Sequence, residues 1–304
     1  MYLDEDIDRG RKIAEILYRT FNTTGIFGRS DMPEDELPKG VKKGSVEHSL
    51  FITLTVAIDY MRDANQLWDA ARKTYEDEET RWLFDPDKVS KADFGEVMKA
   101  MTKYRLSKMH KRDVKTWKTI STILAKEWGG DPIEILKKCD YDALKVLELF
   151  RNSYHYEGGR KVYDFPFLRG DKIGPLWLRM MRDNVGIEGI RNLDKLMPVD
   201  VHIARSTLMT GVLRGNYSGS LDSLKSEISR AWIESVRGLE IDGRKIIAID
   251  IDEPLWHLSK YGCSGRQGKY CPKRQFCPVS KFCVDGLVRI TSKGGGIYYV
   301  EVRT

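Results

Sequence analysis

The sequence predicts an all-α protein that carries one small β-hairpin at its C-terminal end. Apolar residues recur at helical spacing in most segments, as Ile13, Leu17 and Phe21 do near the N-terminus. Capping residues and glycines bracket these segments, which is typical of helix starts and stops. Only residues 287–302, LVRITSKGGGIYYVEV, have a strand pattern, with two β-rich runs around a triple glycine.

The first half of the chain is expected to form a series of helices. Residues 6–22 begin the series, and residues 24–44, rich in glycine, proline and acidic side chains, are expected to be a loop. Residues 45–61 are apolar nearly all round, which predicts a buried helix. Further helices are expected at 63–75, from Ser90 to Lys103, and at 107–128, where Gly129 and Gly130 end the helix.

The second half is expected to continue in the same way. Pro132 opens the next helix, and the helical pattern runs through residues 141–151 to a break at Gly158 and Gly159. A turn followed by a helix is expected in residues 164–183. The remaining segments are two helices, at 197–213 and 220–236, and a cysteine-rich loop at 261–283.

Length and charge set broad limits on the protein. Its 304 residues suggest roughly two domains. No apolar run approaches the ~20 residues of a membrane span, and the acidic N-terminus does not resemble a signal peptide. We therefore expect a cytoplasmic or nucleoid-associated protein with no membrane partner. The net charge of +6 is compatible with a polyanionic partner, and equally with an ordinary solvated surface.

Four of the five cysteines, Cys263, Cys271, Cys277 and Cys283, fall in one short segment. Disulfides are rare inside cells, so a metal site is the better interpretation. Zinc sites usually draw ligands from closely spaced C-x2–4-C pairs, which this segment lacks. A [4Fe–4S] cluster needs four thiolates around a compact cube, and short gaps suit it. We therefore predict a [4Fe–4S] cluster, with zinc as the alternative, and a buried apolar role for Cys139.

The cysteine segment is also basic. It contains five cations, namely Arg266, Lys269, Lys273, Arg274 and Lys281. Surface charge is the simplest explanation for them. The alternative is that the metal stiffens the loop, so that these cations face DNA phosphates and bind them with a strong salt dependence.

Two further residues carry candidate chemistry. The stretch FLRGDKIGPLWLRMM places Lys172 at the start of a helix, directly after a glycine-containing turn. The stretch MPVDVHIARSTLMTGVL places Asp200 at the start of another helix. Taken alone, Asp200 is best explained as a helix N-cap and Lys172 as an exposed surface lysine.

Taken together, LRGDKIG, VDVHIARS and the four cysteines occur in an order that resembles the helix-hairpin-helix DNA glycosylase superfamily, the endonuclease III-like enzymes. The resemblance covers roughly residues 46–283. The region from the hairpin to the aspartate is also similar to archaeal 8-oxoguanine DNA glycosylases. The chain departs from the family pattern in three ways: the turn before the lysine has Gly170 where the family has two glycines, the gap from the lysine to the aspartate is longer than usual, and the cysteine spacing differs from that of endonuclease III.

The resemblance implies a two-lobed helix-hairpin-helix glycosylase fold that acts as a monomer. Residues 46–199 would form a helical barrel ending in the hairpin, and residues 1–45 plus 200–304 would form the iron–sulfur domain. Double-stranded DNA containing a damaged or mismatched base would bind between the lobes and extrude that base. The implied function is a base-excision repair DNA glycosylase with AP-lyase activity. The alternative is a non-catalytic nucleic-acid-binding module built around iron–sulfur or zinc.

The resemblance also implies roles for single residues. The Lys172 amine would attack the sugar and form a Schiff base, and the Asp200 carboxylate would stabilise positive charge on that sugar. Backbone amides around Gly170 and Gly174 would bind a DNA phosphate. Five aromatic residues close to this segment in sequence are candidate walls of a base pocket, although aromatic side chains more often belong to the core: Tyr154, His155, Phe165, Phe167 and Trp177.

Overall fold

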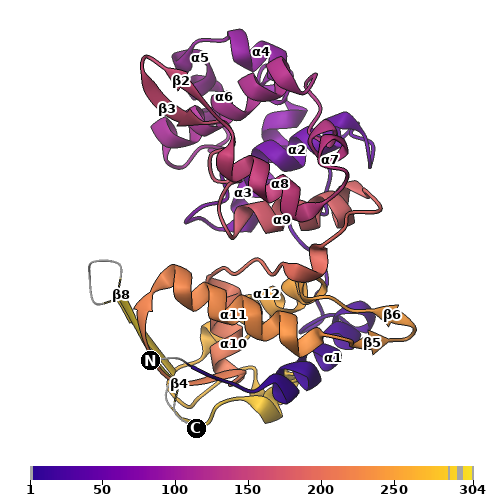
Figure 1. Ribbon diagram of the computed structural model, residues 1–304, viewed down its shortest axis with the longest axis vertical. Helices are drawn as coiled ribbons and strands as arrows, with labels where there is room; N and C mark the ends of the chain where they lie inside the picture. The colour runs from indigo at the N-terminus through magenta and orange to yellow at the C-terminus, as the bar shows by residue number, and fades with distance from the viewer. Residues whose placement is uncertain (1–2, 287, 293–296, 303–304) are drawn as a thin grey trace. The chain divides into compact units, whose positions relative to one another are not determined.

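The computed structural model describes residues 3–286, 288–292 and 297–302, and its fold is mainly helical with a small antiparallel sheet (Figure 1). The chain divides into two compact units. The middle unit comprises Met32–Leu193, and the terminal unit combines Met1–Asp31 with Asp194–Thr304. The boundaries predicted from the sequence, 45/46 and 199/200, differ from these, because residues 32–45 pack with the helical middle of the chain and residues 194–199 with the terminal unit.

The middle unit consists of eight α-helices and one two-stranded ribbon within the described residues. The helices are α2 (Val46–Val56), α3 (Ala64–Glu76), α4 (Pro86–Lys91), α5 (Phe94–Lys103), α6 (His110–Glu127), α7 (Ile133–Lys138), α8 (Ala143–Asn152) and α9 (Ile173–Met180). The ribbon, β2 (Tyr154–Glu157) and β3 (Arg160–Tyr163), lies between α8 and α9 in sequence. A short 3-10 turn at Arg81–Phe84 follows α3, and a π-helical turn at Met181–Val185 follows α9.

Helix α2 is the buried centre of the middle unit, as the sequence predicts. All residues from His48 to Val56 are buried. Phe51 packs against the rings of Trp68 and Phe84, with centroids 5.7 and 5.6 Å apart, and Phe84 also meets Trp117. A helix that is apolar all round can be stable only when neighbours cover every side, and this aromatic cluster covers the side that carries Phe51.

The helix expected from Ser90 to Lys103 is wrong at its start. Helix α4 ends at Lys91, and α5 begins at Phe94. Asp93 caps α5 with a full capping box, because its carboxylate accepts from the Glu96 amide while the Glu96 carboxylate accepts from the Asp93 amide. The D-x-x-E pattern at residues 93–96 therefore marks the start of this helix better than Ser90 does.

The β2–β3 ribbon shows that the Gly158–Gly159 break is in fact a hairpin turn. Both glycines have positive φ, 55° and 76°, as a two-residue type I′ turn requires. Tyr154 pairs with Tyr163, and Glu157 pairs with Arg160. The segment YHYE-GG-RKVY is therefore a β-hairpin, and the glycine pair is its turn and not only the end of a helical series.

Residues 32–45 join the middle unit through polar contacts to its helices. Glu34 and Arg179, only 2% and 1% exposed, form an ion pair inside the unit. Asn184 donates to Asp35 at 2.8 Å, and Arg72 donates to the Pro33 carbonyl at 3.0 Å. A buried charge needs its partner, so this pair fixes the loop onto α9.

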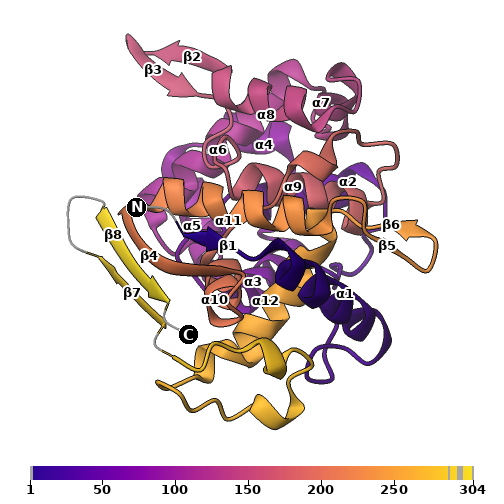
Figure 2. The ribbon, with the colours of Figure 1, turned by 60° about the horizontal axis from the view of Figure 1, so that its bottom comes forward.

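The terminal unit combines helices with the sheet (Figure 2). Its helices are α1 (Ile7–Thr23), α10 (Val201–Met209), α11 (Leu221–Val236) and α12 (Asp252–Tyr261). The sheet order is β1-β4-β8-β7, formed by Asp4–Glu5, Leu213–Ser220, Ile297–Val302 and Val288–Ser292. A two-stranded ribbon, β5 (Glu240–Ile241) with β6 (Arg244–Lys245), lies between α11 and α12 in sequence.

The C-terminal hairpin is present, since β7 and β8 pair antiparallel, although its triple glycine lies outside the described residues. The hairpin joins a larger sheet because β8 also pairs with β4 along six residues. Strand β4 and helix α12 were not anticipated from the sequence. Leu213 and Tyr217, on one face of β4, are both buried, so the strand contributes to the core of its unit.

Candidate functional site

Lys172 lies at the N-cap position of α9, where the sequence analysis placed it. Its side chain is 26% exposed. The amine nitrogen Nζ lies 3.2 Å from Asp59 Oδ2 and 3.4 Å from the Asp59 carbonyl oxygen. Lys172 is thus a half-buried lysine held against a carboxylate, which differs from the fully solvated surface lysine considered above.

The surroundings of Asp59 form a compact polar and aromatic cluster in the middle unit. Asp59 follows the end of α2 and is 8% exposed. Tyr60 packs on Phe167 with ring centroids 5.6 Å apart, and the Arg112 guanidinium lies 4.7 Å and 5.0 Å from these two rings. Sequence reasoning missed Asp59, Tyr60 and Arg112, because only folding brings the segment after α2 and helix α6 together with Lys172 and Phe167.

The turn before α9 is closed by its own backbone bonds. The Gly170 amide donates to the Phe167 carbonyl at 2.9 Å, and the Gly174 amide donates to the Gly170 carbonyl at 3.1 Å. A side chain at Gly174 would collide with Leu168 O and Leu147 Cδ2, at 2.5 and 2.6 Å. Gly174 is therefore a packing residue, and these two amides are occupied; a phosphate at this turn would have to use the amides between them.

The five aromatic candidates divide into core and surface residues. Phe165 and Trp177 are fully buried around Phe150, at centroid distances of 4.7 and 5.2 Å, and Trp177 donates to Thr53 Oγ1. Phe167 lies in the cluster next to Lys172. Tyr154 and His155 are exposed on the β2–β3 ribbon. Phe165 and Trp177 thus have the core role that is usual for aromatic residues.

Asp200 is the N-cap of α10, so the structural role considered for it is present. Its Oδ1 accepts from the amides of His202 and Ile203 at 2.7 and 2.8 Å. Within the described residues, both bonds use the same carboxylate oxygen. The cap thereby fixes the carboxylate at the start of the helix while Oδ2 accepts neither of these bonds.

The cysteine segment folds as a series of tight turns in the terminal unit. Short 3-10 turns at Cys263–Gly265, Arg274–Phe276 and Ser280–Phe282 each place a cysteine at one end. The loop is fixed to the unit at its end, where the Val284 amide donates to the Met209 carbonyl at 2.9 Å. Arg9 adds a second anchor by donating to the Thr210 and Phe282 carbonyls.

The four thiols of this loop influence one another. Burial, then the nearby Cys283 and Cys271, raise the pKa of Cys263 to about 12. A hydrogen bond between Cys277 and Cys283 raises the pKa of Cys277 and lowers that of Cys283 to about 7. Burial and the neighbouring thiols thus keep Cys263 and Cys277 neutral, and several thiolates here would repel one another unless a cation lay among them.

The described residues do not contain a group of three or more His, Cys, Asp or Glu side chains already arranged around a single metal ion. The four-cysteine cluster therefore stays a prediction. Cys139 is 6% exposed in the middle unit, the buried position expected for it.

The cations of the loop have unequal roles. Arg266 donates to the carbonyls of Gly268, Val284 and Gly286, so it closes the loop from within. Arg274 pairs with Asp285 at 3.0 Å on the surface. Lys269 and Lys273 are exposed. The exposed lysines are therefore the better candidates for phosphate contacts, while Arg266 has a clear structural task.

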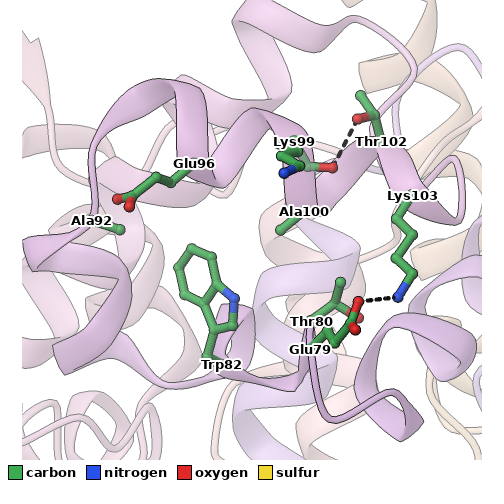
Figure 3. Close-up of a pocket in the computed structure, with 9 residues that line it drawn as sticks. All are labelled: Glu79, Thr80, Trp82, Ala92, Glu96, Lys99, Ala100, Thr102 and Lys103. Atoms are coloured by element: carbon green, nitrogen blue, oxygen red, sulfur yellow. Dashed lines mark hydrogen bonds and ion pairs between the residues drawn. The ribbon is translucent and has the colours of Figure 1, made fainter.

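A separate pocket of about 780 Å³ lies beside α5 in the middle unit (Figure 3). Trp82 forms one wall, and Lys103 Nζ pairs with Glu79 at 2.8 Å. A hydrogen bond from Lys103 lowers the pKa of Asp77 to about 2. None of the predicted site residues is among its nine lining residues, which are Glu79, Thr80, Trp82, Ala92, Glu96, Lys99, Ala100, Thr102 and Lys103.

Lys172 belongs to the middle unit, whereas Asp200 and the four cysteines belong to the terminal unit. The convergence of the amine and the carboxylate on one sugar therefore stays a prediction. In the described residues, no helix is both long and apolar enough to span a bilayer. No protein-family model matches the chain, and no curated protein sequence matches it.

Proposed function

We propose that this protein is a DNA glycosylase with associated AP-lyase activity, which removes a damaged base from double-stranded DNA. The observation that carries the proposal is Lys172, placed at a helix start by a tight turn and held half-buried against Asp59. A lysine in such a position can serve as a nucleophile once it is neutral. Asp200, fixed at the start of α10, supplies the carboxylate that the same chemistry needs.

The proposed reaction uses this chain's own side chains. Lys172 Nζ leaves Asp59, loses a proton and attacks C1′ of the extruded nucleotide. The bond from C1′ to the base breaks, and the base departs with a proton. The Asp200 carboxylate stabilises positive charge on the sugar as that bond breaks. The C1′–O4′ bond then breaks, O4′ takes up a proton, and the nitrogen lone pair forms the imine at C1′. The imine allows loss of a C2′ proton, and the C3′–O bond then breaks with the phosphate as leaving group.

Asp59 acts in this proposal as a positioning residue, because it contacts the amine and not the DNA. The cysteine loop, through Cys263, Cys271, Cys277 and Cys283, would hold a [4Fe–4S] cluster that stiffens the loop and supplies no redox step. The exposed lysines Lys269 and Lys273 would then contact phosphates, with Arg274 beside them.

Borohydride trapping tests the proposal directly. Purified protein is incubated with duplexes that carry uracil, thymine glycol, 8-oxoguanine or an abasic site, and the imine is reduced to a stable amine link. We expect a covalent adduct with at least one duplex. The adduct should be absent in Lys172→Ala and unchanged in Lys126→Ala, an exposed lysine of α6 in the same unit.

The second candidate is a non-catalytic nucleic-acid-binding module. The observation in its favour is that both candidate residues already have structural partners: Lys172 pairs with Asp59, and Asp200 caps α10. This candidate predicts salt-sensitive DNA binding with no base release and no adduct on any of the four duplexes. Such a result would refute the glycosylase proposal.

A further inference from the structure

The β2–β3 ribbon extends from the helices of the middle unit (Figure 2). Its first strand carries exposed aromatic side chains. All four residues of β2 are exposed, and Tyr154 and Tyr156 retain 45% and 69% of their surface. Large exposed aromatic side chains that lie next to one another commonly mark a binding surface. Their exposure here cannot be explained by packing within the described part of the unit.

The base of the ribbon is firmly held. The Asp164 amide donates to the Ser153 carbonyl at 3.2 Å, which closes the ribbon behind its two strands. Asp164 is 3% exposed, and its carboxylate bonds to Ser153 Oγ and to His155 Nδ1. An isolated two-stranded ribbon is marginally stable, so these contacts are what keep the exposed tyrosines in place.

One face of the ribbon gathers three tyrosines and a lysine. Strand alternation places Tyr154 and Tyr156 on the same face of the ribbon. Their partners on the neighbouring strand, Tyr163 and Lys161, share that face. Lys161 Nζ lies 3.7 Å from the Tyr154 ring centroid and 4.9 Å from that of Tyr163. We call Tyr154, Tyr156, Lys161 and Tyr163 the tyrosine–lysine face.

Positive charge lies on this face and beside it. The Arg169 guanidinium stacks on the Tyr163 ring at 3.5 Å, whereas Arg160 is paired with Glu157 and lies on the other face of the ribbon. Glu157 is the acidic residue within the ribbon. Flat aromatic rings beside cations complement a ligand that has both flat apolar faces and negative charges, and nucleotides have both.

We propose that the tyrosine–lysine face binds unpaired nucleotides of DNA, with bases stacked on Tyr154 and Tyr156 and phosphates near Lys161 and Arg169. Unpaired bases are required because the faces of paired bases are already stacked within the duplex. This inference rests on the proposed function, because that function is what makes DNA the expected ligand. The chain runs from β3 through the turn directly into Lys172, so this face would hold nucleotides that flank the damaged one.

Fluorescence anisotropy with dye-labelled oligothymidylate, and with a fully paired duplex of equal length, tests the inference. We expect Tyr154→Ala combined with Tyr156→Ala to weaken single-strand binding about tenfold or more, where tenfold corresponds to ~1.4 kcal/mol. Tyr154→Phe with Tyr156→Phe should bind like the unmodified protein. The matched control is Phe94→Ala, which removes a 40%-exposed aromatic ring from α5 of the same unit.

Three outcomes would overturn the inference. The double alanine variant could bind oligothymidylate normally, or the unmodified protein could bind only the paired duplex. Light scattering could also reveal a dimer that the double alanine variant breaks, which would assign the face to a second copy of the chain. Borohydride trapping on the same variants keeps the two proposals apart, since adduct formation at an abasic site reports on Lys172 whatever the ribbon does.

Discussion

Asp200 can cap a helix and stabilise a sugar cation at once, because the two roles can use different carboxylate oxygens. Asparagine caps helices about as well as aspartate but carries no charge. We therefore expect Asp200→Asn to keep the stability of the protein while base release slows by at least a hundredfold. Single-turnover assays of base release, with urea denaturation of the same samples, provide the measurement.

The companion variant Asp200→Ala separates the roles further. Alanine cannot accept from the amides of His202 and Ile203, so α10 should lose about 1 kcal/mol of stability in addition to the catalytic loss. If Asp200→Asn released the base at the normal rate, Asp200 would be a cap only, and the proposed chemistry would lose its carboxylate.

Because His48 is buried, we expect the free energy of unfolding to depend on pH. It is 1% exposed, and its Nδ1 accepts from the Gly44 amide at 3.2 Å, a bond that a protonated ring cannot accept. Burial, with a smaller effect of Lys43, lowers the pKa of His48 from 6.5 to about 4. Between these values the unfolded chain binds the proton and the folded chain does not, so stability falls as the pH drops from 6.5 toward 4.

The His48 contribution should amount to roughly 3 kcal/mol at pH 4 relative to neutral pH. Urea denaturation across this range should show a flatter pH dependence in His48→Asn, where an amide oxygen can replace Nδ1. His110→Asn, at an exposed histidine of α6, should keep the full dependence. If stability depended on pH equally in both variants, His48 would not be the source of the pH dependence.

The segment before α2 is attached to α9 by the buried pair of Glu34 and Arg179. Glu34→Gln keeps the shape of the side chain but removes the charge that faces the buried guanidinium. We expect this change to destabilise the middle unit by about 3 kcal/mol, since it breaks a buried ion pair by removing the charge of one member. Chemical denaturation followed by tryptophan fluorescence measures the loss.

A close control lies two residues further along the same segment. Glu36 pairs with Arg72 at 3.1 Å, but its side chain is 74% exposed. Exposed pairs contribute little, so Glu36→Gln should change stability by less than about 1 kcal/mol. Equal effects of the two changes would mean that Glu34 does not fix the segment to α9.

The helices were predicted more accurately than the strands, because the sequence patterns that indicate a helix lie within the helix itself. Helices α1, α3, α6 and α11 lie close to where apolar periodicity and caps placed them. Strand β4 was missed because LRGNYSGS is rich in glycine and serine, and its partner β8 lies far away in the sequence. Strand pairing over long separations leaves few local marks, in contrast to helix periodicity.

From the four cysteines of the loop we predict that the purified protein contains bound metal. We expect the purified protein to be brown and to contain about four irons per chain, as a [4Fe–4S] cluster requires. Cys277→Ser should lose the iron and the colour, because three thiolates remain. Cys139→Ser should retain both, since Cys139 is buried in the other unit. Elemental analysis and visible absorption make the measurement.

Removing the metal should affect the two units differently. Chelation should make the cysteine loop sensitive to trypsin at the exposed Lys269 and Lys273, while the middle unit resists cleavage. Zinc in place of iron would support the alternative cofactor. Neither metal in protein purified without oxygen would contradict a metal-bound loop.

The sequence alone predicts that the protein is mainly helical and where most helices lie. It also predicts the two helix starts at Lys172 and Asp200 and shows that four cysteines are clustered. Periodicity, caps and cysteine spacing are local properties, so they survive in the sequence. Folding alone decided that Asp59 meets Lys172 across 113 residues, that Gly174 is a packing residue, and that Arg266 closes its own loop. These outcomes depend on contacts between distant segments, and no local pattern encodes which side chains such contacts bring together.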